Sequence, residues 1–121
     1  MIHTRFGIAL VCASLAPPAV AQAACPGTTQ IELNACAQAE YQAADAELNA
    51  AWRVTKPFFD GLGLGANLLD AQRKWLAFRD AECATEAALY SGGSIQGMIY
   101  STCLTRLTKA RSADLRALGS Q

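Results

Sequence analysis

The segment Asp70–Cys83 places residues of very different character on one face of an expected helix. Gln72, Leu76, Arg79 and Cys83 are separated by four, three and four positions, so a helix brings them onto a single side. A purely apolar core face would contain neither an arginine nor a cysteine. We therefore expect this segment to form the central helix of a small bundle, with Cys83 in a disulfide and Arg79 in a buried polar cluster.

The first 23 residues have the pattern of a secretory signal peptide. Arg5 precedes a run of about ten apolar residues, and Ala21-Gln22-Ala23 matches an A-x-A cleavage site. Pro17 and Pro18 interrupt the run well short of the roughly 20 apolar residues that a membrane helix needs. We expect cleavage after Ala23, export to the periplasm or the medium, and a monomeric domain, residues 24–121, without a membrane span.

Cleavage leaves a chain that lacks the residues used by common enzymes. It removes His3, Cys12 and Arg5, so residues 24–121 contain no histidine, four cysteines, nine basic and ten acidic residues. The near-neutral charge argues against a nucleic-acid partner. The missing histidine argues against Ser-His-Asp and Cys-His catalysis, and the cysteines lack the C-x2-C pair typical of zinc sites. We expect no enzyme activity, no cofactor and no metal.

The pattern along the chain predicts three helices, at about 30–55, 68–90 and 95–118. Thr29 and Glu32 form a capping box at the first start, and Pro57 is expected to end that helix. The glycine-rich segment 58–66 is expected to be a loop, with Asn67 and Ser94 as later N-caps. No segment shows strand alternation. The fold class is therefore all-α, a single antiparallel three-helix bundle.

The expected register suggests how the four cysteines pair. Two short turns place Cys83 level with Cys103, and the strap that carries Cys25 can fold back over Cys36 on the flank of the first helix. We therefore prefer the disulfides Cys25–Cys36 and Cys83–Cys103, as befits a small exported domain. The crossed pairing, Cys36–Cys83 with Cys25–Cys103, stays open because sequence does not fix connectivity.

Several polar residues lie at or beside the apolar stripes. Because buried charge is costly unless paired, we expect these residues to form a structural network. Its main pair would be Arg79 with Asp45, which lies at the same height on the neighbouring helix. The members of the network are Tyr41, Asp45, Gln72, Arg79 and Arg111. Glycoside hydrolysis uses a pair of carboxylates, and the expected helix at 68–90 contains Asp80, Glu82 and Glu86. Solvated helix charges paired with Arg73 or Lys74 are the simpler interpretation.

Several runs of residues together resemble a known family. The resemblance covers residues 25 to about 118. Trp52 stands where the family usually has tyrosine. The motifs that resemble the family are Thr29-x-x-Glu32-x-Asn34-x-Cys36-Ala37, Tyr41-x-x-Ala44-Asp45-x-Glu47-Leu48-Asn49, Ala71-Gln72-Arg73-x-Trp75-Leu76-x-Phe78-Arg79-Asp80-x-Glu82-Cys83, Gly92-Gly93-Ser94 and Cys103-Leu104-x-x-Leu107-Thr108-x-x-Arg111-x-x-x-Leu115. These motifs are similar to those of the lysozyme inhibitor LprI-like N-terminal domain family, small exported bacterial proteins formerly known as a domain of unknown function.

The resemblance implies a protein-binding module that inhibits a lysozyme or another cell-wall hydrolase by occlusion. Residues 24–50 contain four acidic and no basic residues, so the first helix would present an acidic face to a cationic lysozyme. The candidate partner-binding residues are Glu40, Glu47 and Trp75, and the occluding element is a helix face or one of the segments 57–66 and 91–97. The alternative is a structural or adaptor protein of the periplasm without an enzyme target.

Overall fold

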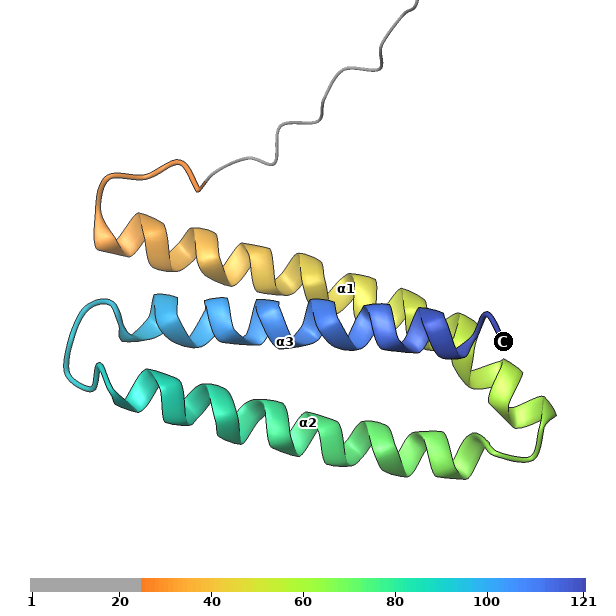
Figure 1. The fold of residues 1–121 in the computed structure, drawn as a ribbon. Coiled ribbons are helices and arrows are strands. Elements are labelled where there is room, and N and C mark those ends of the chain that lie inside the picture. Colours follow the sequence, from red (N-terminus) through yellow and green to blue (C-terminus); the bar gives the residue numbers. More distant parts are fainter. Residues whose placement is uncertain (1–24) are drawn as a thin grey trace, which may run out of the picture.

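The computed structural model describes residues 25–121, so the predicted signal peptide lies outside the described residues. This part of the chain forms three helices, α1 (Gln30–Gly61), α2 (Gly65–Ala88) and α3 (Gln96–Leu118), and no strand. α1 and α3 run in the same direction and α2 runs against both (Figure 1). The predicted all-α, antiparallel three-helix bundle is confirmed.

The central helix of the bundle is α3, so the expectation that the helix containing 70–83 is central was wrong. α3 lies between α1 and α2 (Figure 1), and α1 packs far more extensively on α3 than on α2. Both helices have small buried side chains, which favour a close approach of their backbones. On α1 these are Ala37, Ala44 and Ala51, and on α3 they are Ser101, Thr105, Thr108 and Ser112.

The start of α1 is closed by the predicted capping box. The amide of Glu32 donates to the Thr29 hydroxyl, and the Glu32 carboxylate accepts from the amides of Thr28 and Thr29. These bonds satisfy amide donors that have no partner within the helix.

The end of α1 differs from the prediction, because the helix continues through Pro57 to Gly61. A proline removes one backbone hydrogen bond and usually kinks a helix, and the last turns of α1 bend toward α2 (Figure 1). Phe59 packs against the core, and Lys56 forms an ion pair with Asp60 one turn later. The packing of the partly buried Phe59 against the core therefore favours the two extra turns, which sequence propensity alone does not.

The turn between α1 and α2 is only Leu62–Leu64, so the expected nine-residue loop was wrong. Gly63 adopts a positive φ of 74°, which glycine tolerates best. A Cβ on Gly65 would lie 1.7 Å from Oδ1 of Asp60, so a larger residue at this position would displace the Asp60 side chain. α2 begins at Gly65, and Asn67 lies inside it without capping it.

The turn between α2 and α3 lies close to its predicted position. α2 ends at Ala88 and α3 begins at Gln96. Ser94 was expected to cap α3, but its side chain forms no capping hydrogen bond. Its carbonyl instead accepts a hydrogen bond from Nδ2 of Asn34, at 3.0 Å. This bond holds the turn against the first turns of α1.

The buried apolar residues form two clusters. The larger one, which we name the leucine core, consists of Leu48, Ala51, Leu68 and Leu115, with Trp52, Phe59 and Trp75 packed against it. The other, which we name the cystine core, consists of Cys83, Cys103 and Leu104, with Tyr41 and Leu107 packed against it. Each end of the bundle is thus held by a different kind of interior.

Candidate interaction surfaces

The disulfides link Cys25 to Cys36 and Cys83 to Cys103. Cys83 and Cys103 are fully buried, whereas Cys25 and Cys36 are only partly buried. The crossed pairing is therefore not the one that forms. Glu40 lies near Cys25 and Cys36 in a group that could hold a metal ion by distance alone. Their disulfide leaves no thiolate to act as a ligand.

Arg79 is the polar centre of the bundle and is only 6% exposed. Nε and Nη2 donate to Oδ1 of Asp80 at 2.9 and 2.8 Å, and Nη1 donates to Oγ1 of Thr108 at 3.3 Å. The guanidinium carbon lies 5.5 Å from the ring centre of Tyr41 and 5.2 Å from that of Trp75, within cation–π range. One side chain thereby connects all three helices.

The expected ion pair between Arg79 and Asp45 does not form. Asp45 is partly buried, and its carboxylate accepts a hydrogen bond from Asn49 on the same helix, at 3.4 Å. Arg79 pairs with Asp80, whose side chain stays 56% exposed. Asp80 is the next residue along the chain, and its carboxylate keeps much of its hydration when it pairs with Arg79, so this ion pair has a small desolvation penalty.

The other predicted polar residues form a second, smaller contact. Nε of Arg111 on α3 donates to Oε1 of Gln72 on α2 at 2.9 Å, and Gln72 is buried. The five-residue network expected from the sequence is therefore split. Tyr41 joins Arg79, Gln72 joins Arg111, and Asp45 contacts neither arginine through any hydrogen bond or ion pair described here.

The three carboxylates considered for glycoside hydrolysis have other surroundings. Asp80 is paired with Arg79 and Glu86 with Arg106, and Glu82 is exposed. Arg73 and Lys74, the expected partners, form no ion pair with these acids among the described residues, and Lys74 pairs with Asp70. Two of the three carboxylates are thus neutralised by arginines.

The three candidate partner-binding residues have unequal exposure. Glu40 and Glu47 are exposed on α1. Trp75 is partly buried, packs against the leucine core and lies under the guanidinium of Arg79. Its aromatic surface is therefore used largely inside the domain, whereas the two glutamates are free to meet a partner.

The fold separates charge along the bundle axis. We name the half that contains the α2–α3 turn, residues 25–46 and 78–107, the acidic half. It has six acidic and two basic side chains, a net charge of −4. The basic half, residues 47–77 and 108–121, has four acidic and seven basic side chains, a net charge of +3. The molecule is nearly neutral as a whole but strongly dipolar.

Neither basic side chain of the acidic half is a free surface charge. Arg79 is buried and Arg106 is paired with Glu86. The backbone amides of Thr29 and Thr28, followed by the Thr29 hydroxyl, hold the pKa of Glu32 below its usual value, so it stays ionised. The N-termini of both α1 and α3 lie at this end (Figure 1), and their partial positive charge favours nearby carboxylates.

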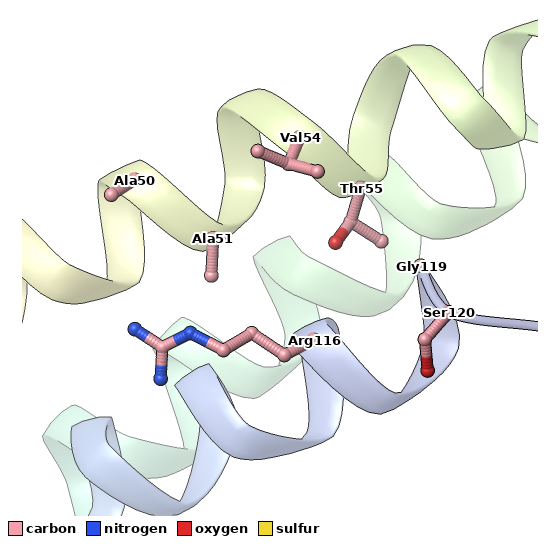
Figure 2. Close-up of a pocket in the computed structure, with 7 residues that line it drawn as sticks. All are labelled: Ala50, Ala51, Val54, Thr55, Arg116, Gly119 and Ser120. Atoms are coloured by element: carbon pink, nitrogen blue, oxygen red, sulfur yellow. The ribbon is translucent and has the colours of Figure 1, made fainter.

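Shallow grooves lie between each pair of helices. The α1–α3 groove has a volume of about 410 Å³. Ala50, Ala51, Val54 and Thr55 of α1 line it together with Arg116 of α3. In Figure 2, Ala51 and Thr55 point toward α3, and the Arg116 side chain extends along the groove. Val54 is 71% exposed. This groove lies in the basic half.

The other two grooves differ in charge. The α1–α2 groove, of about 400 Å³, has both Asp45 and Arg73 among its lining residues. The α2–α3 groove, of about 520 Å³, lies in the acidic half and is lined only by uncharged residues, namely Ala84, Ala87, Gln96, Gly97 and Tyr100. The turn beside it exposes Leu89 and Tyr90.

The described residues, 25–121, include no helix with the length and apolar character needed to cross a membrane.

Comparison with known proteins identifies the family. The model of the family described as "Lysozyme inhibitor LprI" matches residues 21–115. An uncharacterised protein of Rhizobium meliloti (strain 1021) is 37% identical over 102 residues, which cover 74% of this chain and 73% of that protein. The crystal structure of a DUF1311 family protein from Pseudomonas putida KT2440 is 30% identical with a TM-score of 0.64, and covers 78% of this chain and 96% of that one. Because the family match spans most of the chain and the described bundle, the chain belongs to the lysozyme inhibitor LprI family.

Proposed function

We propose that this protein inhibits a lysozyme in the periplasm or outside the cell, by forming a stoichiometric complex that covers the substrate cleft. The observation that carries the proposal is the match of the LprI family over residues 21–115. The predicted signal peptide and the two disulfides support an oxidising compartment outside the cytoplasm.

The chemistry of the described residues supports binding over catalysis. Residues 25–121 contain no histidine, all four cysteines are in disulfides, and Asp80 and Glu86 are paired with arginines. A disulfide-linked helical bundle presents a surface that loses little conformational entropy on binding.

The separation of charge supports a basic partner. The acidic half exposes Glu40 and Glu82 on α1 and α2, and its net charge of −4 would attract a cationic protein before contact. Such attraction raises the association rate chiefly at low ionic strength, since the Debye length falls to about 8 Å at 0.15 M salt.

The test is a titration of the oxidised protein, residues 24–121, into a panel of lysozymes. Turnover of a cell-wall substrate and complex formation are measured together at low and at physiological salt. We expect inhibition that saturates at one inhibitor per enzyme, with weaker binding as salt rises. Unchanged turnover and no complex across the panel would overturn the proposal and favour the structural or adaptor role.

The matched control is the same protein after reduction and alkylation. Because the two disulfides hold the bundle together, the reduced protein should inhibit less at equal concentration. Equal inhibition by the reduced and the oxidised protein would indicate an effect that does not depend on the fold.

A further inference from the structure

We propose that the α2–α3 groove, lined by Ala84, Ala87, Gln96, Gly97 and Tyr100, is the surface on which a strongly basic protein docks. The inference rests on the proposed function and specifies the binding face. The partner is defined by its chemistry, a cationic protein that inserts an uncharged segment into the groove while its basic residues face the acidic half.

Charge complementarity separates this groove from the other two. The α1–α3 groove contains Arg116, whose guanidinium lies along it (Figure 2). The α1–α2 groove contains both Arg73 and Asp45, so its lining has no net negative charge. A cationic partner would meet a like charge in the α1–α3 groove, which costs binding energy, and would gain no net attraction from the lining of the α1–α2 groove. The α2–α3 groove has no cation in its lining and belongs to the half with a net charge of −4.

The composition of this groove suits protein recognition. Ala84, Ala87 and Gly97 make a floor without large side chains, and Tyr100 offers an aromatic ring with a hydroxyl. The neighbouring turn adds exposed Leu89, at 82%, and exposed Tyr90. Tyrosine beside small and polar residues is typical of protein-binding surfaces, because it gives a large contact area with few rotatable bonds.

The groove is also held in shape by a covalent bond. Its two walls are the last turns of α2 and the first turn of α3, and the Cys83–Cys103 disulfide joins these two helices next to Ala84 and Tyr100. Both cysteines are buried, so the link lies beneath the surface and leaves it uncovered. A preformed groove loses less conformational entropy when a partner binds.

A pair of matched substitutions tests the assignment. Ala84 and Ala50 are both exposed alanines inside long helices, and each lines one groove, Ala84 in the acidic half and Ala50 in the basic half. The variants are Ala84→Lys and Ala50→Lys in the oxidised protein. Thermal unfolding of both checks that they fold, and affinity is measured for a lysozyme that the unchanged protein inhibits.

We expect Ala84→Lys to weaken the complex at least about tenfold, because a lysine in this groove meets both the bulk and the charge of a cationic partner. Ala50→Lys should change the affinity by less than about twofold. Equal effects of the two substitutions, or a larger effect of Ala50→Lys, would overturn the assignment while leaving inhibition itself intact. Binding of the unchanged protein to the lysozymes is measured first. If it binds none of them, both proposals are overturned before any variant is compared.

Hydrogen–deuterium exchange of the complex provides a test without substitution. Amides of residues 84–100 should gain protection on binding, whereas those of residues 50–55 and 116–120 should not. Protection confined to the second set would overturn the proposed docking surface.

Discussion

The two halves of this bundle reach stability by different means. The acidic half contains both disulfides and the cystine core, and its buried side chains on α1 are alanines. The basic half contains the leucine core, with three leucines and the packed rings of Trp52, Phe59 and Trp75, and the described residues place no disulfide there. Covalent links thus occur where the apolar interior is thinnest.

The difference shows how a domain of under 100 residues can combine a binding end with a stable end. A chain of this size buries a limited apolar area, so a groove lined by alanine and glycine near the surface contributes little packing. The Cys83–Cys103 disulfide offsets that loss without adding bulk. The following predictions test this division, from the largest expected effect to the smallest.

Leu115→Ala should affect the basic half most. Leu115 is fully buried in the leucine core, and truncation leaves a cavity that lowers the free energy of unfolding by about 4 kcal/mol. Chemical denaturation measures this loss, and hydrogen exchange should show faster opening in residues 47–77 than around Cys83. A loss below about 1 kcal/mol would mean that the leucine core is not the main support of this half.

The double change Cys83→Ala with Cys103→Ala should weaken the acidic half. Breaking a link across 20 residues between two buried cysteines should lower the free energy of unfolding by about 3 kcal/mol. The matched control is Cys25→Ala with Cys36→Ala, which opens a loop of 11 residues at a partly buried site and should have the smaller effect. The reverse ranking in denaturant titrations would contradict this division.

Arg79→Lys tests the boundary between the halves. Lysine keeps the charge but loses the planar fork that contacts Asp80 and Thr108 and the stacking on Tyr41 and Trp75, so we expect a loss of about 2 kcal/mol in the free energy of unfolding. Arg111→Lys, which removes one hydrogen bond to Gln72, is the control and should have a smaller effect. Equal stability of Arg79→Lys and the unchanged protein would show that charge alone suffices at this position.

Glu32→Gln should give the smallest effect, and one that depends on pH. Hydrogen bonds from Thr29 and Thr28 lower the pKa of Glu32 from 4.5, so the folded state binds its proton less tightly than the unfolded state does. The stabilisation is therefore complete above a pH of 4.5 and is lost as pH falls through the lower folded value. The stability gap between the two proteins, measured by denaturation at neutral and acidic pH, should narrow in acid. A gap that is constant with pH would exclude the carboxylate as its origin.

The features predicted correctly from sequence are those set by local chemistry or strong periodicity. The Thr29–Glu32 capping box depends on residues three apart, and the face shared by Gln72, Arg79 and Cys83 depends on helical spacing. All three of these face residues are buried. The positions of the three helices and their antiparallel order follow from the same signals.

The features predicted wrongly depend on contacts between distant parts of the chain. Pro57 does not end α1, because the packing of Phe59 against the leucine core offsets the backbone hydrogen bond that the proline removes. Arg79 pairs with the adjacent Asp80 and not with Asp45, because residues at the same level on two helices need not face each other. The grooves had no sequence signal, since each is shaped by two helices together.

The sequence by itself determined an all-helical chain with a capped first helix, a cysteine count suited to two bridges, and an uneven distribution of charge. These properties arise from residues within a few turns of one another. Only the tertiary structure decided that α3 is the central helix, that Arg79 joins all three helices, and that the charges gather at opposite ends. Each of these depends on which helix faces carry side chains small enough to pack closely, and packing is a property of facing surfaces that no single segment contains.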